Sequence, residues 1–227
     1  DLDILMPRTS QRPFATGFFK KSKGWLFFFF TLLALSLLIA GYYLNIATAT
    51  YLSLGAFFYG YVYTILLKRS SIYNIVIGGL AGSFAVLAGS AAVSPILSIP
   101  AIMLSLILFL WTPPHFWALA IRYRKDYHSA KIPMLPVIAG PEFTGTKMVL
   151  YSLEVWATSI IFAPVAGMGA IYLCGALILG GVFVYLSLQV RRHKTEQSAM
   201  RLFGFSITYL TLLFLIIAID ELVRSGF

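Results

Sequence analysis

Long runs without a charged residue constrain this chain more than any other feature. Residues 24–67 form a run of 44 residues without Asp, Glu, Lys or Arg, and residues 70–121 form another of 52. Between residues 148 and 190 the only charge is Glu154, and residues 202–219 add 18 uncharged positions. A helix needs about 20 apolar residues to cross the hydrocarbon core of a membrane. The first three stretches therefore predict two spans each, and the last predicts one.

Turn signals divide these stretches into seven predicted transmembrane helices. Helix-breaking residues lie at Asn45, between Ser94 and Pro100, and between Pro164 and Gly169. The expected fold class is all-α, a polytopic membrane helical bundle that forms one intramembrane domain over residues 1–227. Charged residues make up only 11% of the chain, which is typical of a membrane protein. The spans are expected at 25–44, 47–67, 72–93, 99–121, 148–166, 170–190 and 202–222.

Pairs of spans separate the charged segments, so these segments are expected to share one face of the membrane. Sixteen of the 17 Lys and Arg residues fall in them, and only Arg224 falls opposite. The positive-inside rule assigns this face to the cytoplasm or the mitochondrial matrix. We therefore expect an integral protein of a bacterial or archaeal cell membrane or of the mitochondrial inner membrane. Because topology explains the basic residues, we expect no binding to nucleic acid. A single cysteine, Cys174, excludes a disulfide framework.

Two charged segments, residues 1–24 and 122–147, combine carboxylates with basic residues. Asp1 and Asp3 lie in the first and Asp126 in the second. Mg²⁺ usually takes one or two carboxylates and completes its shell with water and phosphate oxygens, while Arg and Lys bind the remaining phosphate charge. The segments therefore predict a phosphate site with Mg²⁺. The alternative is a simple ion pair between Asp126 and Arg122, four residues earlier on the same helical face. The polar and basic residues expected near this site are Arg8, Thr9, Arg12, Lys68, Arg69, Arg122, Arg124 and Lys125.

The stretch "FLWTPPHFW", residues 109–117, runs down to the second of these segments. Pro113 and Pro114 remove two backbone donors, so the helix is expected to open near its inner end. An ionisable residue beside such a break, here His115, is a site candidate. The alternative, equally weighted, is a structural histidine whose hydrogen bonds are satisfied inside the protein. The small residues of "GGLAGS", 78–83, predict close helix packing.

Four segments carry a resemblance to a known family. They are "DLDILMPRTSQRP" (1–13), "YTILLKRSSIYNIVIGGLAG" (63–82), "FLWTPPHFWALAI" (109–121) and "DYHSAKIPMLPV" (126–137). With them the chain resembles the UbiA-type intramembrane prenyltransferases, and among these the branch that farnesylates protohaem IX. Ala130 supports that branch, because other members carry an Asp there. Ala85, Val86 and Ser90 depart from the family, which usually shows a Pro pair and a Trp. The family has nine spans, so the resemblance implies that two upstream spans are missing.

The resemblance implies transfer of the farnesyl group of farnesyl diphosphate to a vinyl group of protohaem IX (haem b), giving haem O and diphosphate. Asp3, Asp126 and Lys68 are the implied catalytic residues, and Asp1, Asp3 and Asp126 the implied Mg²⁺ ligands. Trp111 or Tyr127 would stabilise the allylic cation, and His115 would contact the porphyrin. The implied partners are both substrates, the lipid bilayer, and a downstream haem A synthase or terminal oxidase assembly.

Three other functions remain open at this point. A related enzyme could attach a polyprenyl chain to 4-hydroxybenzoate or a naphthoate, and an acid at position 130 would have favoured it. A transporter of anionic substrates also uses basic loops and broken helices, although the hydropathy pattern contains no internal repeat. A non-catalytic assembly factor would share the fold without a complete metal site.

Overall fold

The computed structural model describes residues 2–7, 9–20 and 22–226, apart from the side chains of residues 2 and 3. Within this part of the chain, seven helices are long and apolar enough to cross a membrane, and no strand occurs. The predicted fold class and number of spans are therefore confirmed. The spanning helices are α2 (Lys23–Tyr43), α3 (Ile46–Phe57) continued by η1 (Phe58–Leu67), α4 (Asn74–Gly78) continued by α5 (Leu80–Val93), α6 (Ile99–Arg122), α9 (Gly140–Val165), α10 (Ala170–His193) and α11 (Glu196–Ser225).

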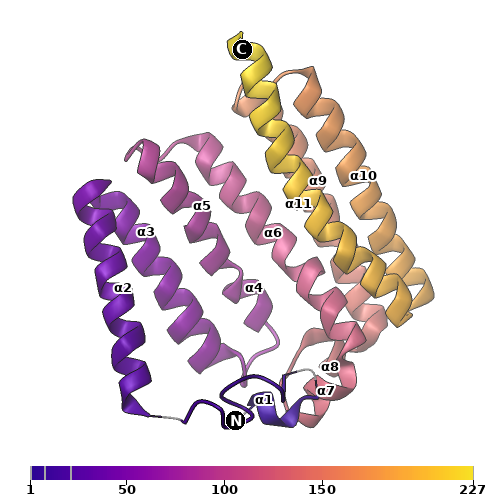
Figure 1. Cartoon of the computed structure of the whole chain (residues 1–227). Coiled ribbons are helices and arrows are strands. Elements are labelled where there is room, and N and C mark those ends of the chain that lie inside the picture. The colour runs from indigo at the N-terminus through magenta and orange to yellow at the C-terminus, as the bar shows by residue number, and fades with distance from the viewer. Residues whose placement is uncertain (1, 8, 21, 227) are drawn as a thin grey trace.

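The charged segments lie at one end of the bundle, as their spacing predicted. Figure 1 places the short helix α1 (Leu2–Leu5), the turn after η1, and helices α7 (Arg124–Ser129) and α8 (Leu135–Ile138) at this end. The turn between α10 and α11 faces the same way, and the C-terminus lies at the opposite end. We call these two ends the basic end and the far end. Which side of the membrane the basic end faces stays a prediction.

Four helices, α6, α9, α10 and α11, form a closed unit in which each packs against two others. We call it the C-terminal unit. Its core contains the fully buried rings of Phe162, Tyr172, Phe183 and Tyr209. The Tyr172 hydroxyl donates to the Ser159 carbonyl oxygen at 2.8 Å, and the Tyr209 and Ser159 hydroxyls are 2.7 Å apart. Interhelical hydrogen bonds and close contacts replace the hydrophobic driving force that helices lose inside a bilayer.

Hydrogen bonds near both ends of α10 join it to the neighbouring helices of the C-terminal unit. The Ser152 hydroxyl on α9 lies 2.7 Å from that of Ser187 on α10, and both residues are fully buried. At the far end, Asp220 on α11 accepts hydrogen bonds from the backbone N–H of Gly169 at 2.6 Å and of Tyr172 at 3.1 Å. The first turn of a helix has backbone donors without intrahelical partners. Asp220 therefore caps α10 from a neighbouring helix.

Helices α2, α3, η1, α4 and α5 form a looser layer, which we call the N-terminal arm. Here α2 packs on α3, α3 on α5, and α5 on α6 of the C-terminal unit (Figure 1). Ala40 is the buried residue of α2, and η1 has none. Within this structure the first two spans of the arm therefore bury fewer side chains than the helices of the C-terminal unit do.

The predicted opening of α6 at Pro113 and Pro114 is wrong, because the helix continues through both residues to Arg122. Both prolines are buried, and the Thr112 hydroxyl donates to the Leu108 carbonyl oxygen at 2.8 Å. One residue before Thr112, the Trp111 indole N–H donates to the Ser206 carbonyl oxygen of α11 at 2.8 Å, which ties α6 to α11. Proline is tolerated inside membrane helices where side chains and neighbouring helices compensate for lost backbone hydrogen bonds.

Two helices begin earlier than their apolar residues indicated. Helix α9 begins at Gly140 rather than 148, and α11 begins at Glu196 rather than 202. Pro141 occupies the first turn of α9, and the Thr195 hydroxyl caps α11 by accepting from the Ser198 N–H at 3.2 Å. These polar first turns lie beyond the apolar stretch, so hydropathy does not register them. The segment predicted as a loop over 122–147 is correspondingly shorter and contains α7 and α8.

Candidate active site

A cleft of about 910 Å³ opens at the basic end between three helix junctions. The inner end of α6 and helix α7 form one wall, and the start of α9 and the α10–α11 turn form the other. Asp126 is the acidic side chain that α7 contributes to it. The charged residues that line the cleft are Arg122, Arg124, Lys125, Asp126, Lys194 and Glu196, together with His128.

Helix α7 holds Asp126 in the cleft because the chain on either side of it is anchored. Only Tyr123 separates α6 from α7. After α7, Lys131 adopts a positive φ of 53°, and the N–H of Ile132 donates to the Tyr127 carbonyl oxygen at 2.9 Å. Ile132 and Met134 are then buried in the core. A carboxylate on a short helix fixed at both ends has little freedom to leave the cleft.

The predicted alternative for Asp126, an ion pair with Arg122, is wrong. Arg122 instead pairs with Glu196 at the start of α11. On the same wall, Lys194 pairs with Glu142 at 2.8 Å. These pairs join α6 to α11 and the α10–α11 turn to α9. Because Arg122 bonds elsewhere, the Asp126 carboxylate is not neutralised by it and remains a candidate ligand for a cation.

The structure brings four of the predicted site residues together: Arg122, Arg124, Lys125 and Asp126 all line the cleft. Lys68 and Arg69 follow η1 at the same end, where the Lys68 N–H donates to the Tyr63 carbonyl oxygen at 2.8 Å. Thr9 is buried, Arg12 and Arg69 are exposed, and Tyr127 packs against the core. These residues do not line the cleft. Asp1, Arg8 and the side chain of Asp3 lie outside the described part of the chain.

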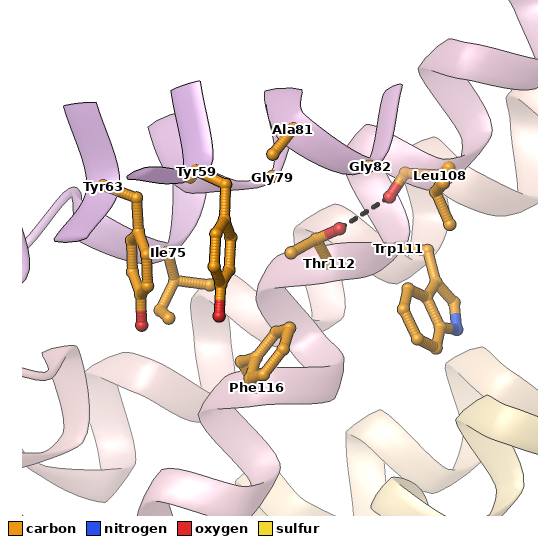
Figure 2. A pocket seen from close by; sticks show the side chains of 11 residues that line it. Tyr59, Tyr63, Ile75, Gly79, Ala81, Gly82, Leu108, Trp111, Thr112 and Phe116 are labelled. Carbon is orange, nitrogen blue, oxygen red and sulfur yellow. Dashed lines mark hydrogen bonds between the residues drawn. The ribbon is translucent and has the colours of Figure 1, made fainter. Parts of the chain in front are cut away.

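A second, apolar cavity of about 310 Å³ lies between η1, the α4–α5 segment and α6 (Figure 2). Four aromatic side chains, Tyr59, Tyr63, Trp111 and Phe116, line it. The two tyrosines come from η1, a ten-residue π-helix, and their rings are 5.9 Å apart. Wide helical turns of this kind are rare and often occur at functional sites. Here the π-helix presents two tyrosines, four residues apart, to one cavity.

Small residues form the opposite wall of the aromatic cavity. A Cβ added at Gly78 would lie 2.7 Å from the Tyr63 ring, and one added at Gly79 would lie 3.2 Å from Thr112. The close helix packing predicted for "GGLAGS" is therefore confirmed. Gly78, Gly79 and Gly82 also line the cavity, so the absence of side chains there contributes to its volume.

His115 is buried in the continuous helix α6, with both faces of its ring covered. The Trp111 ring stacks on one face at 4.3 Å, and the Phe203 ring of α11 stacks on the other at 4.6 Å. Its Nδ1 lies 2.7 Å from the Ser206 hydroxyl oxygen, and that hydroxyl donates to the Phe203 carbonyl oxygen at 2.6 Å. If the Ser206 hydroxyl donates to the Phe203 carbonyl oxygen, Nδ1 carries the proton and Nε2 is the acceptor of the neutral ring.

Sequence reasoning missed three groups that shape the site. Tyr59 and Tyr63 have a readable spacing of four residues, but a π-helix cannot be recognised from composition. Glu196 lies 74 residues from its partner Arg122, and Ser206 lies 91 residues from His115. No local pattern connects residues so far apart, because tertiary packing brings them together.

The fold, the charged cleft and the aromatic cavity define a polytopic helical membrane protein whose polar site lies at one end of the bundle. The chain belongs to the UbiA prenyltransferase family, because the sequence model of that family matches residues 1–215.

Curated relatives match nearly the whole chain. Protoheme IX farnesyltransferase 2 of Paramagnetospirillum magneticum is 42% identical over 225 residues, which cover 99% of this chain and 78% of that protein. Protoheme IX farnesyltransferase of Parafrankia sp. is 46% identical over 222 residues, covering 96% of this chain and 70% of that protein. The enzyme of the same name from Roseiflexus castenholzii is 44% identical over 226 residues, covering 98% of this chain and 42% of that protein. No solved structure matches the chain.

Proposed function

We propose that this protein transfers the farnesyl group of farnesyl diphosphate to a vinyl group of protohaem IX, producing haem O and diphosphate. The observation that carries the proposal is the placement of Asp126 beside Arg124 and Lys125 in the cleft, with the aromatic cavity near it along α6. Phe116 and Arg122 are separated by six residues, or about 9 Å of helix. An amphiphilic diphosphate requires both environments, because its charged head needs the cleft and its apolar chain needs the cavity. Identity of 41–46% to proteins named protoheme IX farnesyltransferase supports the acceptor.

The diphosphate would bind in the cleft. When the bond between the farnesyl carbon and its oxygen breaks, both electrons leave with the diphosphate, and Arg124 and Lys125 stabilise the growing negative charge. Asp126 would hold Mg²⁺, with Asp1 and Asp3 as further ligands outside the described residues. Glu196, the other carboxylate of the cleft, pairs with Arg122, and a carboxylate such as Asp126 among cations fits a metal that shares its shell with phosphate oxygens. Bound there, Mg²⁺ would neutralise the leaving group.

The farnesyl chain would occupy the aromatic cavity. Ring faces such as those of Trp111 and Tyr63 attract a cation, by roughly 2 kcal/mol where water is excluded. The allylic cation would thus be stabilised until a vinyl carbon of protohaem attacks it and forms the new carbon–carbon bond. Water adds to the resulting cation and releases a proton, which leaves the hydroxyl group of haem O. Downstream, a haem A synthase or terminal oxidase assembly would take this product.

Ala130 favours a haem acceptor over a phenolic one. It is buried, and its N–H donates to the Asp126 carbonyl oxygen at 3.0 Å. A carboxylate at this position would lose its hydration, which is costly without a partner. Ala130 therefore distinguishes this site from that of family members that carry an Asp at this position and use hydroxybenzoate or naphthoate as acceptor.

The complete enzyme tests the acceptor directly. Farnesyl diphosphate is supplied with either protohaem IX or 4-hydroxybenzoate, and products are identified by mass. We expect farnesylated product from protohaem alone, and product from hydroxybenzoate alone would contradict the assignment. Chelation of divalent metal should abolish transfer and added Mg²⁺ should restore it. Full activity after chelation would remove Mg²⁺ from the proposal.

The basic end would face the cytoplasm or the matrix. Single cysteines placed at Lys23, Ser70, Lys131 and Lys194 should react with an impermeant reagent from that side, and cysteines at Ser98 and Ser225 from the other. Labelling of positions 131 and 194 from opposite sides would contradict the arrangement of spans.

A further inference from the structure

A separate pocket of about 360 Å³ lies on the outer side of the α10–α11 turn. Residues on one face of each helix line it. Tyr185, Gln189 and His193 follow each other at four-residue spacing on α10, and Gln197 and Arg201 do so on α11. Residues four apart share one side of a helix. The two helices therefore present two parallel rows of polar side chains to one pocket.

This pocket and the candidate active site are lined by different residues of the same turn. Lys194 and Glu196 line the cleft, whereas His193, Thr195 and Gln197 line the pocket. No lining residue belongs to both among the described residues. Both carboxylates near the turn are engaged on the cleft side, Glu196 with Arg122 and Glu142 with Lys194. The pocket is thus separate from the cleft and has no acidic residue in its lining.

The pocket is suited to an anion. Arg201 is exposed, and within the described part of the chain no carboxylate pairs with it. Gln189 and Gln197 add amide donors, and Tyr185 adds a hydroxyl. The first turn of α11 also contributes the positive end of a long helix. An arginine surrounded by neutral donors is the arrangement that binds phosphate.

The position of the pocket relative to the membrane identifies the kind of anion. Val190 is the last apolar residue of α10 before Arg191, and Tyr185 lies five residues earlier, about 8 Å into the apolar stretch. Tyrosine is typical of the membrane–water interface. The pocket therefore spans the boundary, with Arg201 and His193 at headgroup level and Tyr185 and Leu186 at acyl level.

The surface beyond the pocket is apolar and open. Ile178 and Val182 continue the Tyr185 face of α10 and are 67% and 37% exposed. On α11, no atom lies within 4 Å of the position that a Cβ would take at Gly204. Acyl chains can lie along this face while the headgroup occupies the pocket. Basic pockets between membrane helices bind anionic lipid headgroups in this way.

We propose that the pocket between α10 and α11 binds the phosphate headgroup of an anionic phospholipid. Arg201 pairs with the phosphate, Gln189 and Gln197 donate hydrogen bonds to its oxygens, and the acyl chains extend along Ile178 and Val182. This site is separate from farnesyl transfer and does not depend on the proposed function.

The test uses the complete enzyme, stripped of lipid in detergent and then exposed to equal amounts of phosphatidylglycerol and phosphatidylcholine. Native mass spectrometry measures which lipid stays bound. We expect selective retention of phosphatidylglycerol, reduced about tenfold by Arg201→Gln because a charge-assisted hydrogen bond is lost. Arg192→Gln removes the same charge from the same end without touching the pocket, so its retention should stay within about twofold of the original.

A second variant, Gln189→Leu, keeps the size of the side chain and should reduce retention severalfold while leaving farnesyl transfer unchanged. Equal losses in Arg192→Gln and Arg201→Gln would show diffuse attraction and overturn the proposal. Equal retention of phosphatidylcholine would do the same. Displacement of the lipid by inorganic phosphate at the same concentration would identify a site for soluble anions and contradict the lipid assignment.

Discussion

The C-terminal unit and the N-terminal arm are both made of apolar helices, but different forces hold them together. In the unit, side chains of different helices bond inside the membrane, as in the Ser152–Ser187 pair and the contact between Tyr209 and Ser159. In the arm, the Asn45 amide donates to the Ala91 carbonyl oxygen at 2.6 Å near the far end, and η1 has no buried residue. Among the described residues, the unit therefore has more hydrogen bonds between its own helices than the arm has.

The aromatic cavity lies where these two regions meet. Helix α6 belongs to the unit and carries Trp111 and Phe116 into the aromatic cavity, while η1 of the arm supplies Tyr59 and Tyr63. One wall of the cavity thus belongs to the unit and the other to the arm. A flexible apolar chain can enter such a cavity where the two regions meet.

The largest expected effect is a loss of enzymatic activity that leaves the stability of the fold unchanged. Asp126→Asn keeps the shape of the side chain but removes the negative charge that the proposed metal site needs. In the complete enzyme we expect turnover to fall at least about 100-fold, or about 2.7 kcal/mol in the barrier, with the melting temperature unchanged. Steady-state rates and thermal unfolding of the same sample measure both. Glu221→Gln, at the far end, is the matched control and should keep full activity. Full activity of Asp126→Asn would exclude Asp126 from the site.

The next prediction compares the packing of the unit with that of the arm by adding one methyl group to each. A Cβ at Gly180 would lie 1.9 Å from Trp156, whereas one at Gly89 of α5 meets no atom within 4 Å. Overpacking costs about 1–3 kcal/mol, so Gly180→Ala should lower the melting temperature by roughly 2–12 °C. Gly89→Ala should leave the melting temperature unchanged or raise it slightly, because alanine favours helix. Equal decreases in both variants would remove the difference between the two regions.

A third change acts on the wall of the aromatic cavity that the N-terminal arm forms. Gly78→Ala places a methyl group 2.7 Å from the Tyr63 ring, so the ring must move and narrow the cavity. We expect KM for farnesyl diphosphate to rise roughly tenfold while the melting temperature falls less than in Gly180→Ala. Gly60→Ala, which lies in η1 three residues before Tyr63 and faces open space, is the control. If KM stays the same in Gly78→Ala, the farnesyl chain does not occupy this cavity.

The smallest effect tests the hydrogen bonds of the unit. Ser187→Ala leaves the buried Ser152 hydroxyl without its interhelical partner, which costs about 0.6–1 kcal/mol in membrane helices. The melting temperature should fall by about 1–4 °C. Ser36→Ala in α2 removes only an exposed bond to Leu32 of the same helix, so it should shift the melting temperature by less than that. A larger decrease for Ser36→Ala would indicate that the arm, rather than the unit, limits stability.

Hydropathy predicted the spans because it measures the property that the bilayer selects. It placed the starts of α9 and α11 too late, since Gly140–Lys147 and the first turn at Glu196 are helical outside the apolar stretch. It could not anticipate that α6 continues through Pro113, because α6 also packs against other helices, for example through the hydrogen bond of Trp111 to Ser206 of α11. Local patterns report local preferences, and neighbouring helices override them.

The same limit applies to the candidate site. Clustered charges in one segment predicted that Arg124, Lys125 and Asp126 lie together, and all three line the cleft, because residues so close in sequence stay together in any fold. The pairing of Arg122 with Glu196 required knowledge of which helices are neighbours. Thr9, which was expected near the substrate, is buried in the turn after α1, with its hydroxyl 3.4 Å from the Met6 carbonyl oxygen. Threonine hydroxyls in turns often bond to nearby backbone in this way, and the sequence does not reveal it.

The cap that Asp220 places on α10 has a consequence for biosynthesis. The backbone donors of Gly169 and Tyr172 enter the membrane with α10, but their acceptor is the twenty-fifth residue of the next helix to be synthesised. Until α11 is nearly complete, the start of α10 has donors without this partner. A nascent chain released before Asp220 would contain all of α10 yet lack the group that closes its first turn. The last span thus completes the hydrogen bonding of the one before it.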